Sequence, residues 1–358
     1  VDLKGYIYVS YMNGNAIKKF DRSGNSVEIG KSILSNTKWV HVFRFEGSIY
    51  ASLAAIYVSD KGGDRIVKFD MAGNLIGTID MKSIGKADTL YVDYLTNYIY
   101  ASDSAACVVN EINQSGNKVS TIGSKQVLNN PRGITIDEDH NLWVVSKGNN
   151  SLVEFNSERP RKMINEVGKG YLNSPSDSVD EFSSDNICVS DTMNKRLVFF
   201  SGTGHLIYEY YGQRTGNAAS RINFNRPTGV AISYPTPDVV YVMDEWKDNY
   251  ILYGLSINLK EIPHSTPVTG VTVAGITVLN KTGANVKISW NLSTDAKEYL
   301  IYRKSKTDKI FSLIATVIGN VGIYEDKGLT PGSVFTYYVV ATENAGNIGD
   351  AGKAIIIT

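Results

Sequence analysis

Short apolar runs alternate with polar loops along the first three quarters of the chain, and they return in a fixed order. Each unit has an apolar run that ends in Ser or Ser-Asp or a close variant, a polar loop and a second apolar run, and three units then continue into a Gly-Asn turn. Such short, bounded runs predict β-strands. The first runs of the six units are Tyr6–Ser10, Ile56–Asp60, Ile99–Asp103, Leu142–Ser146, Ile187–Asp191 and Val240–Asp244.

The spacing of the units predicts how their strands are assembled. The units recur every 43 or 44 residues, as measured between Ser59, Ser102, Ser146 and Ser190. Flanking runs such as Gly133–Ile136 bring the expected number of strands in a unit to four. A period of about 40–45 residues with four short strands is typical of β-propellers. A small sheet with two apolar faces needs a neighbour on each side, so six units predict a closed ring of six blades.

The first two units are irregular. Nothing upstream of Val1 serves as the innermost strand of the first unit, so upstream residues or another segment must take that place. The second unit contains an additional apolar run, Ser48–Ser52, which either fills this gap or forms a bulge. The chain begins without Met or an apolar leader, as expected of a mature form or of a fragment.

Particular residues connect the repeat to a known family. The stretch Asp191–Phe199 resembles the core of the NHL repeat, and Asn130–Ile134 resembles the start of its innermost strand. The resemblance covers residues 1–264 and implies a six-bladed β-propeller. Four positions depart from the repeat, with Tyr11 and Lys147 in place of Asp and Ala16 and Val108 in place of Arg.

The pattern changes after Ile262, where Pro263–Pro267 predicts a short, stiff linker. The strands beyond it resemble a bacterial fibronectin type III module, in which Trp290 would be the core tryptophan. Phe335 stands where that family has a corner tyrosine, so the hydroxyl bond of that corner is expected to be missing. The expected fold is therefore all-β, with a six-bladed β-propeller over 1–264 and a fibronectin type III-like β-sandwich over 265–358.

Composition narrows the range of partners. The chain has 36 basic and 36 acidic residues and a pI of about 7.1, without the basic excess that is usual in nucleic-acid binders. No nucleic-acid partner is expected, although a neutral sum can conceal a local basic patch. No apolar run reaches the roughly 18 residues of a membrane span. The two cysteines, Cys107 and Cys188, exclude a disulfide scaffold and are expected to be unbonded core residues in non-adjacent blades.

The loop aspartates of the repeat and the arginines that follow them are the candidate binding positions. They could ring one face of the propeller and bind a ligand. Alternatively, the aspartates cap backbone donors at strand ends, or they pair with the arginines of neighbouring blades. These six positions are Asp60, Arg65, Asp103, Asp191, Arg196 and Asp244.

Metal and catalytic sites are less strongly indicated. The run Asp137–His140 is expected to be a solvated turn, because consecutive residues point to opposite sides. His41 is the only histidine on an innermost-type strand, and one histidine cannot build a zinc site. Resemblance to propeller lactonases would imply an axial divalent cation, with three acidic residues available. Those residues are Asp93, Asp177 and Asp180.

The tyrosines Tyr208, Tyr210 and Tyr211 could form a stacking surface for sugars or pack between blades. No catalytic residue, metal ligand or cofactor is predicted.

The expected function is a non-catalytic extracellular binding or structural scaffold, in which the propeller is a rigid platform and the sandwich a spacer. Expected partners are a protein or glycan on a propeller face, with self-assembly as a further option. Two alternatives stay open. One is a lyase or lactone hydrolase with an axial divalent metal. The other is a structural component of a phage particle or an extracellular filament, so the expected location is the cell exterior or surface, or a virion.

Overall fold

The structure is a computed structural model. It describes residues 1–2, 4–10, 15–43, 54–181, 186–202, 204, 206–211, 223–232, 239–246, 249–256, 272–280, 283–292, 296, 298–305, 312–318, 320–342 and 348–357. The chain divides into two compact units. One comprises Val1–Leu197 and Tyr211–Ile257, and the other comprises Val198–Tyr210 and Asn258–Thr358. The expected linker Pro263–Pro267 and the expected boundary at residue 264 lie outside the described residues.

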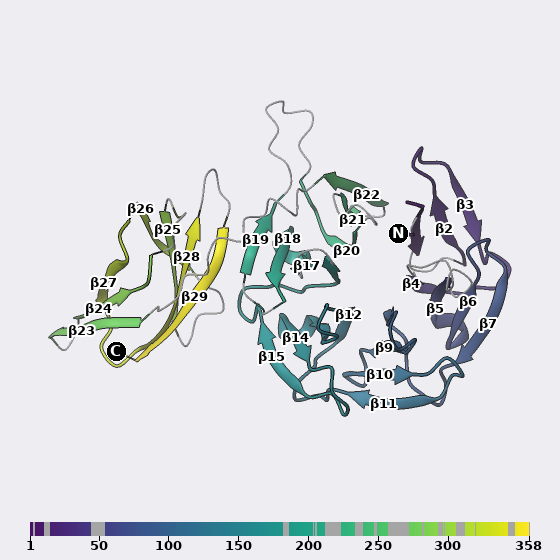
Figure 1. The fold of residues 1–358 in the computed structure, drawn as a ribbon, viewed down its shortest axis with the longest axis horizontal. Helices are drawn as coiled ribbons and strands as arrows, with labels where there is room; N and C mark the ends of the chain where they lie inside the picture. The colour runs from purple at the N-terminus through teal and green to yellow at the C-terminus, as the bar shows by residue number, and fades with distance from the viewer. Residues whose placement is uncertain are drawn as a thin grey trace. The chain divides into compact units, whose positions relative to one another are not determined.

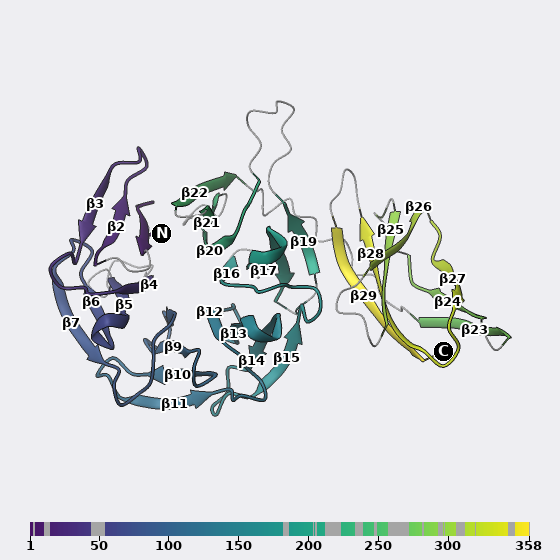
Figure 2. The same ribbon diagram turned by 180° about the vertical axis from the view of Figure 1, so that it is seen from behind.

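Six antiparallel sheets stand around a common centre as the blades of a six-bladed β-propeller (Figures 1 and 2). The first three sheets are β1 (Ile7–Ser10), β2 (Ile17–Phe20) and β3 (Ser26–Ile29); β4 (Thr37–Phe43), β5 (Ala55–Asp60), β6 (Arg65–Phe69) and β7 (Leu75–Asp80); and β8 (Leu90–Val92), β9 (Ile99–Asp103), β10 (Val108–Ile112) and β11 (Lys118–Ile122). The other three are β12 (Pro131–Ile136), β13 (Leu142–Ser146), β14 (Ser151–Phe155) and β15 (Met163–Val167); β16 (Ser178–Glu181), β17 (Asn186–Asp191), β18 (Arg196–Ser201) and β19 (Leu206–Tyr210); and β20 (Pro227–Ile232), β21 (Val239–Trp246) and β22 (Asn249–Ser256).

The apolar runs expected to be innermost, around Val40, Leu90, Gly133 and Gly229, do lie in the edge strands β4, β8, β12 and β20, and β16 takes the same place in the fifth blade. In the first blade the innermost described strand is β1, which corresponds to the second strand of the other blades. The extra run Ser48–Ser52 lies outside the described residues, as does the apolar run after β22, over 259–262.

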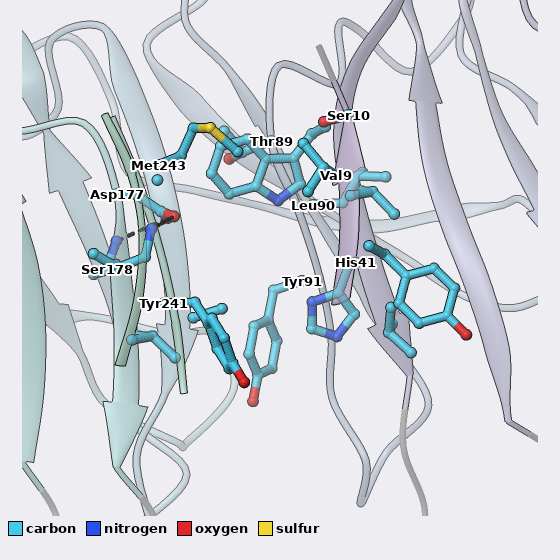
Figure 3. A pocket seen from close by; sticks show the side chains of 18 of the residues that line it. Val9, Ser10, His41, Thr89, Leu90, Tyr91, Asp177, Ser178, Tyr241 and Met243 are labelled. Carbon is cyan, nitrogen blue, oxygen red and sulfur yellow. Dashed lines mark hydrogen bonds between the residues drawn. The ribbon is translucent and has the colours of Figure 1, made fainter. Parts of the chain in front are cut away.

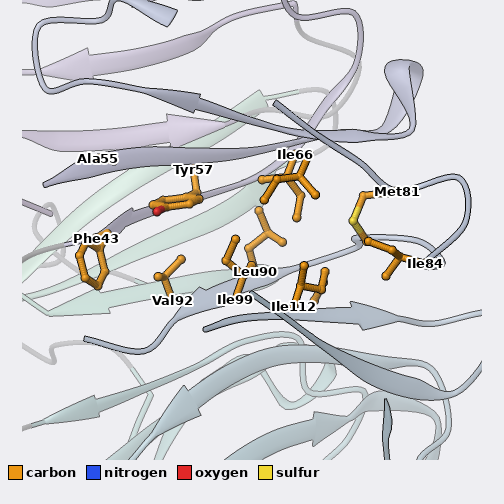
Figure 4. Close-up of a cluster of buried hydrophobic side chains, with 12 residues drawn as sticks. Phe43, Ala55, Tyr57, Ile66, Met81, Ile84, Leu90, Val92, Ile99 and Ile112 are labelled. Carbon is orange, nitrogen blue, oxygen red and sulfur yellow. The ribbon is translucent and has the colours of Figure 1, made fainter. Parts of the chain in front are cut away.

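Apolar side chains fill the space between neighbouring blades. Successive residues of a strand point to opposite faces, so each sheet sends one set of side chains to each neighbour. Between blades two and three, Tyr57 and Ile66 pack with Leu90 and Ile99 in one buried cluster (Figure 4). Burying one such side chain contributes about 1.5–3 kcal/mol, so the ring is stabilised mainly between blades.

The residues from 272 onward form two further antiparallel sheets. One contains β23 (Thr272–Asn280), β24 (Gly283–Ser289) and β27 (Ile323–Leu329); the other contains β26 (Ser312–Ile318), β25 (Glu298–Ser305), β28 (Val334–Thr342) and β29 (Ile348–Ile357). One buried cluster takes side chains from both sheets, among them Val286, Tyr299 and Val339. The two sheets therefore share a core, as in a β-sandwich.

Trp290 lies in that core, as the sequence predicted, with its ring centroid 5.3 Å from that of Tyr299. Phe335 is also buried there and has no hydroxyl group. A buried hydroxyl bond is made two residues later instead, where Tyr337 donates to Asp326 Oδ2 at 2.7 Å. Asp326 also pairs with Arg303 at 2.8 Å, so its buried carboxylate has two partners.

Trp290→Ala should destabilise the sandwich by roughly 3–5 kcal/mol, because the substitution leaves a large cavity in a shared core. Scanning calorimetry of the full chain should show one transition at a lower temperature and the propeller transition unchanged. Leu292→Ala, at a nearby exposed position, is the control and should leave both transitions in place. Equal shifts of both transitions by Trp290→Ala would contradict two separately folding units.

Candidate functional site

Aspartates at the ends of the second strands hold the loops that lead into the innermost strands. Asp60 is fully buried, and its Oδ1 accepts hydrogen bonds from the backbone N–H groups of Ser35 and Asn36, both at 3.0 Å. These two residues directly precede β4. Burial acts to raise the pKa of Asp60. The N–H groups of Asn36 and Ser35, together with the Arg65 and Ser35 side chains, outweigh this effect and leave the pKa below its ordinary value.

The same contact recurs in blades three to six. In each, a side chain at the end of the second strand accepts a backbone N–H of the preceding loop. Asp103 accepts from Lys86 at 2.8 Å, Ser146 from Asn129 at 3.0 Å, Asp191 from Asn173 at 2.6 Å, and Asp244 from Asn225 at 2.9 Å. We call this contact the loop clamp. It fixes the path of the chain from one blade into the centre of the next, since the donors have no partner in a regular strand ladder.

The two arginines strengthen the clamp from within their own hairpins. Arg196 Nε lies 2.7 Å from Asp191 Oδ2, and its guanidinium lies 4.2 Å from the ring centroid of Tyr171. Arg65 pairs with Asp60 in the same way at 2.9 Å. The expectation that such pairs join neighbouring blades is therefore wrong, because β-hairpin register places each Arg beside its own Asp. Burial raises the pKa of Asp191, and Arg196 opposes that effect.

None of these six predicted positions lies among the residues that line the central cavity. The contacts of the described residues give the aspartates a structural role, and a ligand-binding role for them stays a prediction.

The inner strands enclose a cavity of about 1190 Å³ at the centre of the propeller (Figure 3). Its wall takes side chains from β1, β4, β8, β12, β16, β20 and β21. Ser10 and Val9 of β1 face this space directly, because no described strand lies inside β1. Cavities of this size, walled by strands of several blades, are large enough for a small ligand.

Five basic side chains line one end of the cavity, and we call them the cation arc. They are Lys38, Lys61, Arg132, Lys147 and Arg226. Each lies at the start of an innermost strand or directly after the end of a second strand, and these two places are neighbours in the sheet register. The arc is continuous: Lys38 interacts electrostatically with Lys61 and Arg132, and Lys147 interacts with Arg132 and Arg226.

Two carboxylates offset part of this charge. Asp88 forms an ion pair with Lys38, and Glu245 lies 3.4 Å from Arg226. Among the described residues, Lys61, Arg132 and Lys147 have no acidic partner within ion-pair distance. Burial lowers the pKa of Lys147, and Arg132 and Arg226 lower it further. The neutral composition therefore conceals a positive end of the cavity.

Three half-buried rings lie farther along the cavity wall, and we call them the aromatic row. His41, Tyr91 and Tyr241 come from blades two, three and six, and all three line the cavity (Figure 3). The ring centroids of His41 and Tyr91 are 4.8 Å apart. His41 stands three residues beyond Lys38 on β4, which separates the row from the arc by about 10 Å along the strand.

Asp177 is a buried carboxyl in the same wall. Its side chain joins blades five and six, since Oδ2 accepts the N–H of Val230 at 2.9 Å. Its Oδ1 accepts the N–H of Ser178 at 2.8 Å. A Cβ on Gly133 would lie 2.6 Å from this Oδ1, so the neighbouring inner strand needs glycine there. Burial raises the pKa of Asp177 to about 8, against the effect of the two N–H donors.

The carboxylates considered for an axial metal do not gather. Within the described residues, no three His, Cys, Asp or Glu side chains are placed to hold a metal ion. Asp93 accepts hydrogen bonds from Leu95 and Thr96 in its own turn. Asp180 lies in the cavity wall but is only 3% exposed.

Other predicted positions need smaller corrections. The run Asp137–His140 is a turn, as expected, but Asp137 is buried and accepts the indole N–H of Trp143 at 2.7 Å rather than being solvated. Both cysteines are free. Cys188 is buried as expected, whereas Cys107 is partly exposed in the loop between β9 and β10.

The tyrosines after β18 divide between packing and surface roles. Tyr208 contacts Phe199 and Tyr210 through ring centroids 5.8 and 6.5 Å apart. Tyr211 is 54% exposed and accepts a hydrogen bond from Arg196.

Comparison with known proteins identifies the fold but no family. No family model matches the chain. It is 29% identical over 136 residues to a poly(3-hydroxybutyrate) depolymerase of Ralstonia pickettii and 35% identical over 92 residues to exoglucanase B of Cellulomonas fimi. These matches cover 38% and 24% of this chain but only 24% and 8% of the two relatives. The chain thus spans a quarter or less of their length.

Solved structures resemble the chain more broadly. A luciferin-regenerating enzyme is 12% identical with a TM-score of 0.53, covering 72% of this chain and 89% of its own. A chain of a nidogen/laminin complex is 17% identical with a TM-score of 0.52, covering 70% and 89%. At this identity the likeness shows the fold alone. Among the described residues, no helix has the length and apolar character to cross a membrane.

Asp191→Ala should destabilise the propeller by about 3–5 kcal/mol, because it removes the clamp and leaves the buried Arg196 without its carboxylate. Urea denaturation measures the change. Asp139→Ala, at an exposed turn position, should stay within about 0.5 kcal/mol of the wild type. A similar small effect of Asp191→Ala would contradict the clamp.

The pH dependence of stability should report the buried Asp177. Its pKa rises from 3.8 in the unfolded chain to about 8 in the folded chain. The contribution of Asp177 to the free energy of unfolding is therefore fully present below pH 4 and is lost as the pH rises toward 8. The loss approaches about 1.4 kcal/mol per pH unit. Asp177→Asn, which cannot ionise, should flatten the curve of unfolding free energy between pH 5 and 8. Parallel curves for the two proteins would contradict this origin.

Proposed function

We propose that this protein is a non-catalytic extracellular recognition scaffold that binds its ligand in the central cavity of the propeller. One observation carries the proposal: a cavity of about 1190 Å³ brings a cation arc and an aromatic row together on strands of several blades. Neither group has an evident role in folding, since like charges crowd one end and the rings stay half exposed. Polar and aromatic groups that converge in a large cavity are the usual features of a binding site.

The rigidity of the wall supports recognition. Thr89 Oγ1 in blade three donates to Arg132 O in blade four at 2.8 Å. Thr192 Oγ1 in blade five donates to Pro227 O in blade six at 2.7 Å. Such bonds fix neighbouring inner strands against each other, so the side chains of the site are held in place before a ligand arrives.

The sandwich fits the role of a fibronectin type III-like spacer. Its two sheets share a core around Trp290, and the chain has local similarity to an exoglucanase and to chitinase C of Streptomyces lividans. These relatives are named for polymeric carbohydrates, and one structural neighbour of the propeller is a chain of a nidogen/laminin complex. Both points support an extracellular protein that presents the propeller to a glycan or protein partner, at a cell surface or within a larger assembly.

A variant with a filled cavity tests the location of the site. Ala231 lines the cavity on β20 beside Tyr241, so Ala231→Trp should occupy space next to the aromatic row. Binding to an array of purified extracellular glycans and matrix proteins should weaken at least tenfold, about 1.4 kcal/mol. Val119→Trp, on the exposed strand β11, is the matched control and should bind as the wild type.

Unchanged binding by Ala231→Trp, with an unchanged melting temperature, would place the site elsewhere.

Metal analysis of the purified protein separates recognition from catalysis. A stoichiometric divalent cation held by three or more side chains in the cavity would favour the lyase or lactone hydrolase alternative.

A further inference from the structure

We propose that the ligand of the central cavity is an acidic oligosaccharide. Its carboxylate or sulfate group binds to Lys61, Arg132 and Lys147, and one of its sugar rings packs on the aromatic row. This inference rests on the proposed function, because it assigns a ligand class to the same cavity.

The charge of the arc selects an anionic group. Lys38 is neutralised by Asp88, whose Oδ2 also accepts the N–H of Ser104. The remaining cations lie on both sides of Arg132, whose planar guanidinium can donate two parallel hydrogen bonds to a carboxylate or sulfate.

Acidic residues elsewhere do not cancel this charge at the cavity surface. Asp60 and Asp244 lie behind the arc, fully buried, and their carboxylates accept backbone N–H bonds of the loop clamps. Asp177 and Asp180 are in the wall but are almost completely covered. Glu245 also lines the cavity, but it is paired with Arg226. Lys61, Arg132 and Lys147 therefore remain as the cations of the arc that have no acidic partner among the described residues.

The aromatic row favours a sugar ring as the uncharged part of the ligand. A sugar ring has an apolar C–H face and hydroxyl groups at its edge, so it packs on an aromatic face while polar tips bind its rim. His41, Tyr91 and Tyr241 supply both, with two phenol hydroxyls and an imidazole at one end of the cavity (Figure 3). The spacing of about 10 Å between the row and the arc requires a ligand longer than one inorganic anion.

Overall charge makes a nucleic acid the weaker candidate. RNA also combines anions with ring faces, but its affinity depends on many phosphate contacts. This chain has equal numbers of acidic and basic residues, and among the described residues only three cations of the arc lack an acidic partner.

Isothermal titration calorimetry of the full chain tests the proposal with five probes. Two are acidic, a trigalacturonate and a sulfated heparin-type tetrasaccharide, which distinguish carboxylate from sulfate. The methyl ester of the trigalacturonate, sodium sulfate and a short oligouridylate are the comparisons. The protein should bind at least one acidic probe about tenfold more tightly than any of these three. Affinity should fall as salt rises.

The double variant Arg132→Gln/Lys147→Gln should lose at least tenfold in affinity for the acidic probe, and Tyr91→Leu should lose a similar factor without changing the salt dependence. Lys125→Gln, at an exposed position outside the cavity, should bind as the wild type. Melting curves of all variants should match, which keeps loss of folding separate from loss of binding.

Several outcomes would overturn the inference: equal binding of the acid and its ester, equal binding of sodium sulfate, tighter binding of the oligouridylate, or no binding of either acidic probe. If another array ligand still binds and Ala231→Trp still weakens it, the proposed function stands while the ligand class is wrong. If Ala231→Trp weakens no ligand, the proposed function fails as well.

Discussion

A small twisted sheet has two apolar faces, and in this propeller each face is covered only by the next blade. The chain must therefore leave the outer edge of one blade and reach the centre of the next at a fixed place. The loop clamp provides that place, because a buried Asp or Ser at the end of the second strand of blades two to six accepts backbone N–H groups of the incoming loop. Packing supplies the free energy between blades, and the clamp determines which residues meet at the centre.

The central cavity follows from this arrangement. The residue that follows each clamp Asp or Ser lies beside the first residues of an inner strand, at the same end of the ring. Equivalent positions of successive repeats therefore line the same part of the cavity wall. In the second and fourth blades that position holds Lys61 and Lys147. Basic residues as far apart in the sequence as Lys38 and Arg132, or Lys147 and Arg226, thus become neighbours. Their mutual repulsion is tolerated because they border open space rather than a packed core.

The polar residues of the wall have two kinds of role. Asp177 and Thr89 bond across blade boundaries and hold the inner strands together. Arg132, by contrast, has no ion-pair partner among the described residues and faces the cavity. This division between groups that hold the wall and groups that face the ligand lets one ring remain rigid and still present binding chemistry.

The sequence alone determined the number of blades, the order of their strands, the buried Trp290 and the second all-β unit, because these depend on local periodicity that repeats along the chain. It offered backbone capping as one role of the loop aspartates, which the contacts of Asp60 and Asp191 match. It did not reveal that their arginine partners lie in the same hairpins, that Asp137 is buried, or that five cations converge. Those features depend on distances between residues far apart in the chain, which only ring closure fixes. The repeat suggested Lys147 in place of an Asp, and this was wrong by one residue: Ser146 takes the Asp position in the loop clamp, and Lys147 follows it, as Lys61 follows Asp60. Only the tertiary structure placed that lysine beside Arg132 and Arg226 at the cavity.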